Sequence, residues 1–178
     1  MTTVQLRHHH DVDAVRPALL TVYADVYADQ DDAFHSTDRF DERLSSHAAR
    51  PGWETVIAYA GGEPAGFAYA VPLGPDTAWW KHMITPLPEG YAAEDGHRTL
   101  AFNELMIRKP WRGQGLSQRL HDELLAHRDE QRVTLLVDPD HPKVMDLYRT
   151  WGYEEVGRQQ PFPDSPVFAA MARPLHLS

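Results

Sequence analysis

The sequence predicts one domain of mixed α/β (α+β) class, built on a central sheet. Short β-rich runs alternate along the chain with longer runs whose apolar residues recur at helical spacing. Turn residues such as Gly-Gly and Pro-Gly separate these runs. The chain has 178 residues, an ordinary length for one domain, so we expect a single domain over residues 1–178.

The first half of the chain is expected to supply a strand, two helices and a β-hairpin. In chain order, these are residues 4–7, 12–26, 38–49, 53–60 and 65–72. The hairpin turn is expected at Gly61-Gly62-Glu63-Pro64, because these residue types favour turns. Residues 73–98 have no regular pattern, and connections of this length are usually functional or disordered.

The second half of the chain is expected to add four strands and two helices. The strands are residues 100–107, 133–137, 153–158 and 167–173, and the helices are residues 116–127 and 144–151. In the second helix, Val144, Leu147, Tyr148 and Trp151 form one apolar stripe, which we expect to be buried. The whole order predicts a mixed, mainly antiparallel sheet of about seven strands flanked by about four helices.

Composition excludes several classes of function. The chain has 26 acidic and 17 basic side chains and a net charge of -9, which argues against a nucleic-acid partner. It has no cysteine, so thiolate zinc ligands and a cysteine nucleophile are absent. We expect no metal site, and we place His8-His9-His10 in a solvated loop. No apolar run reaches the ~18 residues of a membrane span, and the first residues lack the apolar core of a signal peptide, so we expect a cytoplasmic protein without a membrane partner.

A glycine-containing turn between a strand and a helix is the best candidate for a ligand site. The segment Arg112-Gly113-Gln114-Gly115-Leu116-Ser117 combines backbone freedom, a helix N-terminus and a permanent cation, which together suit a pyrophosphate. It is not a P-loop, since no Gly-Lys pair occurs, and it is not a dinucleotide fingerprint, since Gln118 stands where glycine is needed. The spacing alone is equally compatible with a plain turn and an exposed arginine.

Two motifs at a fixed separation favour a ligand site over a plain turn at this segment. The stretch 103–117 resembles motif A of the GNAT superfamily of N-acetyltransferases, a strand followed by [RQ]-x-x-G-x-[GA] and a helix, although Ser117 replaces the usual glycine or alanine. The stretch 147–157, with Tyr148, Gly152 and Gly157, resembles motif B of the same family. The predicted strand order between residues 3 and 174 also resembles that family.

The resemblance implies that the chain binds acetyl-CoA as acyl donor. The pantetheine arm would pair with the end of the strand, and the pyrophosphate would lie on the backbone N–H groups of the following loop. His141 stands where many relatives have asparagine, which implies a contact with CoA or a role in proton transfer, but a loop histidine without a ligand is the simpler interpretation. The expected cofactor-binding residues are Met106, Ile107, Arg108, Arg112, Gly113, Gln114, Gly115, Leu116, Ser117 and His141.

The resemblance also implies two catalytic residues. Tyr148 matches the tyrosine that protonates the departing CoA thiolate, and a phenol pKa of about 10 against about 8.5 for a thiol makes this transfer feasible. Glu104, near the middle of the strand, is the best candidate for the base, provided that a β-bulge turns it toward the site. The alternatives are a core tyrosine and an internally paired carboxylate.

The acceptor site is expected from segments outside the two motifs. Aromatic faces attract cations and carboxylates hold ammonium groups, so we expect the acceptor to contact Tyr27, Asp31, Phe34, Trp79 and Trp80. The predicted function is transfer of an acetyl group from acetyl-CoA to a primary amine of a small molecule or peptide, directly within a ternary complex. The alternative is a non-catalytic acyl-CoA-binding sensor or partner module. A homodimer is compatible with the sequence.

Overall fold

The computed structural model describes residues 2–177 and divides the chain into two compact units. The N-terminal unit contains the chain up to Val71 together with Phe102–Arg128. The C-terminal unit contains Pro72–Ala101 and the chain from Asp129 onward. The expectation of one domain over residues 1–178 stays a prediction, and each unit is described by itself below.

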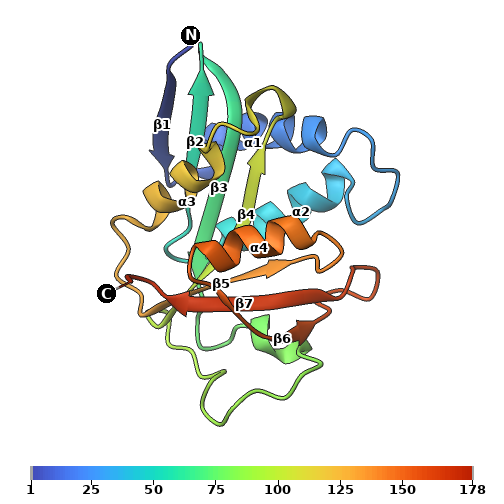
Figure 1. Ribbon diagram of the computed structural model, residues 1–178, viewed down its shortest axis with the longest axis vertical. Coiled ribbons are helices and arrows are strands. Elements are labelled where there is room, and N and C mark those ends of the chain that lie inside the picture. The colour runs from blue at the N-terminus through green and yellow to red at the C-terminus, as the bar shows by residue number, and fades with distance from the viewer. Residues whose placement is uncertain (1, 178) are drawn as a thin grey trace. The chain divides into compact units, whose positions relative to one another are not determined.

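The predicted fold class is confirmed. Within residues 2–177 the strands form a seven-stranded sheet in the order β1-β2-β3-β4-β5-β7-β6, in which β4 and β5 are parallel and the other recorded pairings are antiparallel. The strands β1–β7 and the helices α1–α4 are labelled in Figure 1. In chain order, the elements are β1 (Val4–His9), α1 (Val12–Val26), α2 (Thr37–Ala48), β2 (Glu54–Ala60), β3 (Glu63–Pro72), η1 (Trp79–His82), β4 (Thr99–Ile107), η2 (Lys109–Trp111), α3 (Leu116–Leu125), β5 (Arg132–Val137), α4 (Pro142–Thr150), β6 (Glu154–Gln159) and β7 (Phe168–Pro174).

The core of the N-terminal unit lies between the helix pair α1–α2 and one face of β2 and β3. Tyr23 of α1 stacks on Phe40 of α2 with ring centroids 4.0 Å apart, and Ile57, Phe67 and Tyr69 belong to the same buried cluster. Phe67 and Tyr69 alternate along β3, and Ile57 of β2 is the register partner of Phe67, so the three side chains share one face of the sheet. Helix α3 packs instead against β1 and β2.

The expectation of a solvated histidine loop near residue 8 is wrong. β1 extends to His9, and both ring nitrogens of His8 contact carboxylates, at 2.5 Å from Glu54 and 2.9 Å from Glu123 of α3. Burial lowers the pKa of His8, but these two hydrogen bonds outweigh burial and raise the pKa above its ordinary value. His8 therefore joins β1, β2 and α3 as a structural residue.

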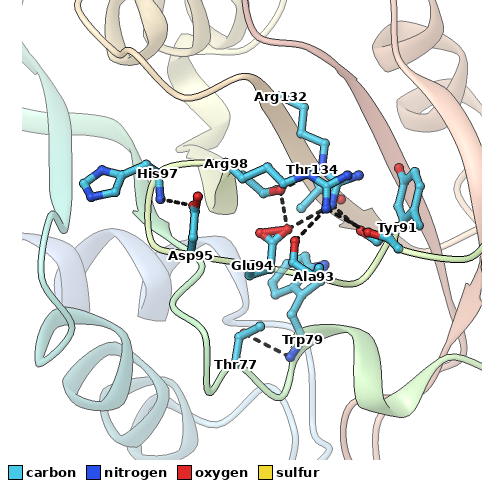
Figure 2. A network of polar contacts seen from close by, with 12 residues as sticks. Thr77, Trp79, Tyr91, Ala93, Glu94, Asp95, His97, Arg98, Arg132 and Thr134 are labelled. Carbon is cyan, nitrogen blue, oxygen red and sulfur yellow. Dashed lines mark hydrogen bonds and ion pairs between the residues drawn. The ribbon is translucent and has the colours of Figure 1, made fainter.

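In the C-terminal unit, the long segment before β4 is fixed by two arginines. Arg132 of β5 donates to the Tyr91 carbonyl at 2.6 Å and to Glu94 at 2.9 Å, and Glu94 also accepts from Thr99 at 2.5 Å (Figure 2). Arg98 donates to backbone carbonyls of the same segment. Carbonyls and a carboxylate of the segment thus find partners without regular secondary structure.

The apolar stripe predicted for the last helix is only half correct. Tyr148 and Trp151 are buried, at 8 % and 7 % exposed, but Val144 and Leu147 are 43 % and 38 % exposed. Met145, which the predicted stripe omitted, is buried in their place. The sequence shows the amphipathic period of α4, but the direction of its buried face depends on what α4 packs against.

Gly66 of β3 is required by the close approach of β4. A Cβ atom at this position would lie 2.5 Å from the Met106 carbonyl oxygen and 2.8 Å from Ile107 Cδ1. We expect Gly66→Ala to lower the free energy of unfolding by about 1–3 kcal/mol, because backbone must shift to admit the methyl group. Urea unfolding measures this change. Gly74→Ala is the control, since nothing lies within 4 Å of its Cβ position, and equal stability of the two variants would contradict the prediction.

Candidate active site

Strand β4 contains one more residue than the part of β3 that it pairs with. The Leu73 N–H donates to the Thr99 carbonyl, and the Arg108 N–H donates to the Ala65 carbonyl, both at 2.9 Å. Ala65 lies eight positions before Leu73 on the β3 side of the pair, whereas Arg108 lies nine positions after Thr99 on the β4 side. The extra residue is the signature of a β-bulge, which re-aims the side chains that follow it.

Side-chain directions along β4 agree with this bulge. Phe102 packs against His121 of α3, with ring centroids 5.2 Å apart, whereas Met106 belongs to the core beneath α1 and α2. Both residues are even-numbered, and regular alternation would place them on one face. Glu104 lies on the Met106 side, because it interacts electrostatically with Arg43 of α2 and with Tyr23 of α1.

Glu104 has the electrostatic properties of a general base. Its side chain is partly exposed, yet the surrounding protein raises the pKa of its carboxyl group to about 7 by burial, against the opposing attraction of Arg43. A carboxyl group with this pKa is part protonated and part ionised near neutral pH. Perturbed carboxyl groups of this kind concentrate at functional sites.

Four side chains surround Glu104 and form with it what we call the Glu104 cluster: Arg43, His47, Tyr23 and Tyr69. Arg43 donates to the Tyr23 hydroxyl at 3.1 Å, and His47 Nδ1 lies 2.9 Å from the Tyr69 hydroxyl. Burial raises the pKa of Tyr23 to about 12 and that of Tyr69 well above its ordinary value. Burial lowers the pKa of His47 to about 4. The tyrosines and His47 are therefore uncharged at neutral pH.

The backbone at the end of β4 presents a hydrogen-bond donor away from β3. Successive residues of a strand direct their N–H groups to opposite neighbours. Since the Arg108 N–H bonds to β3, the Ile107 N–H points to the other edge of β4. On that edge, the recorded pairing with β5 covers Thr99–Ala101, the first three residues of β4.

The glycine-containing loop after β4 has open space around its backbone and leaves the first N–H groups of α3 without a side-chain cap. Gly113 and Gly115 have φ of 75° and 72°, and the space around the Cβ position of each is open to 4 Å. Gly115 is the N-cap of α3 and offers no side chain to the first N–H groups of the helix. Residues 112–115 are all exposed, so an anion can reach these donors.

The two arginines of motif A have different partners. Arg112 Nε donates to the Ile107 carbonyl at 2.8 Å, which places this guanidinium beside the end of β4. Arg108 Nε donates to Asp25 of α1 at 2.9 Å, and Arg108 Nη1 donates to the Pro64 carbonyl at 3.2 Å. A carboxylate thus already neutralises Arg108, so Arg112 is the better candidate for a phosphate.

Tyr148 and His141 both lie in the C-terminal unit. Tyr148 is buried on α4, where its ring meets Trp151 and Tyr153 edge-on at 5.4 Å and 5.8 Å. His141 is the N-cap residue of α4, and its side chain is 71 % exposed. These positions leave the functional roles of both residues as predictions.

The residues expected at the acceptor site lie in different surroundings. Tyr27 stacks on His35 at 4.7 Å, and the Phe34 ring lies 4.6 Å from the Arg43 guanidinium carbon, so both adjoin the Glu104 cluster. Asp31 is exposed in the segment between α1 and α2.

The two predicted tryptophans belong to the C-terminal unit. Trp80 is 6 % exposed and is part of a buried apolar cluster, and Arg132 lies 5.4 Å from its ring centroid. Trp79 is partly buried beside it, and its backbone N–H bonds to Thr77 (Figure 2). This placement favours a structural role for Trp80.

The sequence interpretation missed four members of the Glu104 cluster. Arg43 stands in an acid-rich segment, and Tyr23 and Tyr69 lie among apolar residues of the core, so each has an ordinary structural explanation. The one available signal was the helical spacing of Arg43 and His47, which places them on the same side of α2.

Residues 2–177 contain neither a cluster of ligand-type side chains that could hold a metal ion nor a helix that could span a membrane. No group of three or more His, Asp or Glu residues in this range is placed to hold a metal ion. None of the helices described is long and apolar enough to cross a membrane.

Comparison with known proteins identifies the family. The profile described as "Acetyltransferase (GNAT) family" matches residues 19–153, more than half of the chain. No curated protein matches the chain.

Several solved structures share the fold at low sequence identity. An N-acetyltransferase from Staphylococcus aureus Mu50 is 14 % identical with a TM-score of 0.67, covering 98 % of this chain and 100 % of its own. An acetyltransferase from Thermus thermophilus is 17 % identical with a TM-score of 0.66, covering 98 % and 99 %. The protein yncA from Salmonella typhimurium, solved with its cofactor acetyl-CoA, is 14 % identical with a TM-score of 0.65, covering 99 % and 96 %.

The raised pKa of Glu104 makes stability depend on pH. Between about pH 4.5 and pH 7 the folded protein keeps a proton that the unfolded chain releases, so the free energy of unfolding falls as pH rises. We expect the free energy of unfolding of Glu104→Gln to fall by roughly 1–3 kcal/mol less than that of the wild type over this pH range. Urea unfolding at pH 5 and pH 8 measures it. The exposed Glu63→Gln is the control, and an unchanged pH dependence in Glu104→Gln would refute the prediction.

Proposed function

Because the chain belongs to the acetyltransferase (GNAT) family, whose members use acetyl-CoA, we propose that it transfers the acetyl group to a primary amine of a small molecule or peptide. One observation carries the choice of an amine acceptor. Glu104, a partly exposed carboxyl group with a pKa near 7, follows the bulge of the strand that ends at Ile107. An amine must lose a proton before it attacks, and Glu104 can accept that proton.

Acetyl-CoA would be held by the end of β4 and the loop that follows. In this proposal the backbone of Met106, Ile107 and Arg108 pairs with the pantetheine arm. The Arg112 guanidinium and the first N–H groups of α3 bind the pyrophosphate, which the open glycine positions support. The loop residues proposed for this contact are Gly113, Gln114, Gly115, Leu116 and Ser117, and His141 is proposed as a further contact at the start of α4.

Acetyl-CoA supplies the acyl group as a thioester, whose carbonyl carbon the amine attacks. Glu104 takes one proton of the ammonium group, directly or through water, and the neutral amine forms the C–N bond. The nitrogen gives its second proton to solvent as the C–S bond breaks. The Ile107 N–H, which points away from β3, donates to the oxygen on which negative charge develops. Tyr148 donates its phenolic proton to the departing sulfur, a transfer between groups with pKa values of about 10 and about 8.5.

Transfer would be direct. The chain contains no cysteine, so no acetyl-cysteine can form. A serine or threonine ester would need an adjacent base. A direct reaction within a ternary complex is the simplest mechanism for the residues present. The alternative function, a non-catalytic acyl-CoA-binding module, would not require a carboxyl group with a pKa near 7.

Release of free thiol from acetyl-CoA tests the proposed function. We expect a panel of primary amines to include acceptors that accelerate release, with Glu104→Gln lowering kcat for the best acceptor by roughly 100-fold, the size of a typical general-base contribution. Glu63→Gln is the matched control and should keep the wild-type rate. Tight CoA binding without amine-dependent release would favour the binding module and overturn the proposal.

Tyr148→Phe tests the proposed proton donor. We expect kcat to fall roughly 10- to 100-fold because the thiolate leaves unprotonated, while the Kd for CoA, measured by calorimetry, changes little. Tyr153→Phe is the control, since it removes a buried hydroxyl from a neighbouring ring that has no proposed role. An unchanged kcat in Tyr148→Phe would remove this residue from the mechanism.

A further inference from the structure

The recorded side-chain hydrogen bonds of Arg43 within residues 2–177 go to uncharged groups. Its two recorded side-chain hydrogen bonds, each 3.1 Å long, go to the Phe34 carbonyl and the Tyr23 hydroxyl, both uncharged. Six other arginines bond to a carboxylate within residues 2–177: Arg16, Arg108, Arg128, Arg132, Arg149 and Arg158. A guanidinium that is partly withdrawn from water and has neutral partners favours an anionic ligand.

The remaining groups of the Glu104 cluster do not compensate this charge. Tyr23 and Tyr69 stay protonated because their pKa values are raised, and His47 stays neutral because its pKa is lowered. Glu104 exerts a pull on Arg43, but it is protonated for part of the time near neutral pH. Arg43 is therefore the one member of the cluster that is charged at all times near neutral pH. Its positive charge attracts an anionic group of a bound ligand.

Both charged members of the cluster can be reached by a ligand. Tyr23 and Tyr69 are 1 % and 0 % exposed, whereas Arg43 and Glu104 each keep partly exposed surface. A guanidinium has five N–H donors, and the two recorded bonds leave three for a ligand. The Phe34 ring, 4.6 Å from the guanidinium carbon, helps to fix its orientation.

We propose that the acceptor carries a carboxylate beside its amine, as a free amino acid does, and that Arg43 binds the carboxylate while Glu104 receives the proton of the amine. This inference rests on the proposed function and names its acceptor class. It makes Arg43 a specificity-determining residue. A polycationic acceptor such as an aminoglycoside would meet repulsion from Arg43 without gaining an anion contact.

The test compares L-amino acids with the matching L-amino-acid amides as acceptors. The two members of a pair have the same side chain and differ in the carboxylate. The amide loses its ammonium proton more easily, so a preference for the acid cannot come from amine basicity. We expect kcat/KM for the best amino acid to exceed that of its amide roughly tenfold or more, the size of a hydrogen-bonded charge contact.

Variants of Arg43 test whether the preference for amino acids over their amides depends on the Arg43 side chain. We expect Arg43→Met to lower the ratio of kcat/KM for the amino acid to kcat/KM for its amide by that same factor and to leave the Kd for CoA nearly unchanged. A loss shared by both acceptors reflects the effect of Arg43 on the pKa of Glu104, and it cancels in this ratio. Arg43→Lys should keep part of the preference, because it retains the charge but loses the planar fork. Arg158→Met, which removes an arginine from an exposed ion pair on β6, is the control and should keep both reactions.

The outcomes separate this inference from the proposed function. Amides that react as well as amino acids with the wild-type protein would overturn the amino-acid assignment while amine acetylation stands. An equal loss for both acceptors in a folded Arg43→Met variant would also overturn it. Thiol release with neither member of any pair, although CoA binds, would overturn the proposed function and this inference together. The wild-type comparison decides the question even if Arg43 variants fail to fold.

Discussion

One extra residue in β4 determines the geometry of the candidate site. Strand side chains alternate between faces, so a single inserted residue moves every later side chain to the other face and reverses every later N–H group. The same insertion places Glu104 on the side of α1 and α2 and turns the Ile107 N–H to the edge away from β3. The proposed base and the proposed oxyanion donor are therefore coupled through one feature of the backbone, and Gly66 permits the close strand approach beside it.

The environment of Glu104 raises the pKa of its carboxyl group, which suits a general base but lowers the free energy of unfolding once the group ionises. Burial beneath two helices opposes ionisation of the carboxyl group, and the attraction of Arg43 offsets only part of that effect. The aromatic surroundings that keep Tyr23 and Tyr69 neutral also leave Arg43 hydrogen-bonded to uncharged groups, with Glu104 as its electrostatic partner. Groups in this condition respond strongly to a bound ligand, because a charge contact gains most where little water competes. The cluster thus links acceptor binding to the protonation of the base.

The structural relatives share the fold at identities of 14–17 %, so the fold tolerates extensive change in sequence. The loop from Arg112 to Ser117 depends mainly on backbone N–H groups and glycine conformations. In the function proposed above, acceptor recognition depends instead on side chains such as Arg43 of α2, which interacts with Glu104 of β4. Variation in α1 and α2 can therefore change the acceptor without disturbing the donor site.

The sequence alone predicted the order of the elements and the family and supplied a candidate donor loop, because these depend on local features: hydrophobic period, glycines between a strand and a helix, and two motifs at a fixed separation. It also supplied Glu104 as a candidate but could not show its direction, since the bulge becomes apparent only against the register of β3. The tertiary structure alone joined Arg43, Tyr23, Tyr69 and His47 to Glu104, buried Trp80 and exposed Val144 and Leu147. Those outcomes depend on which distant segments pack together, and a one-dimensional pattern does not contain that information.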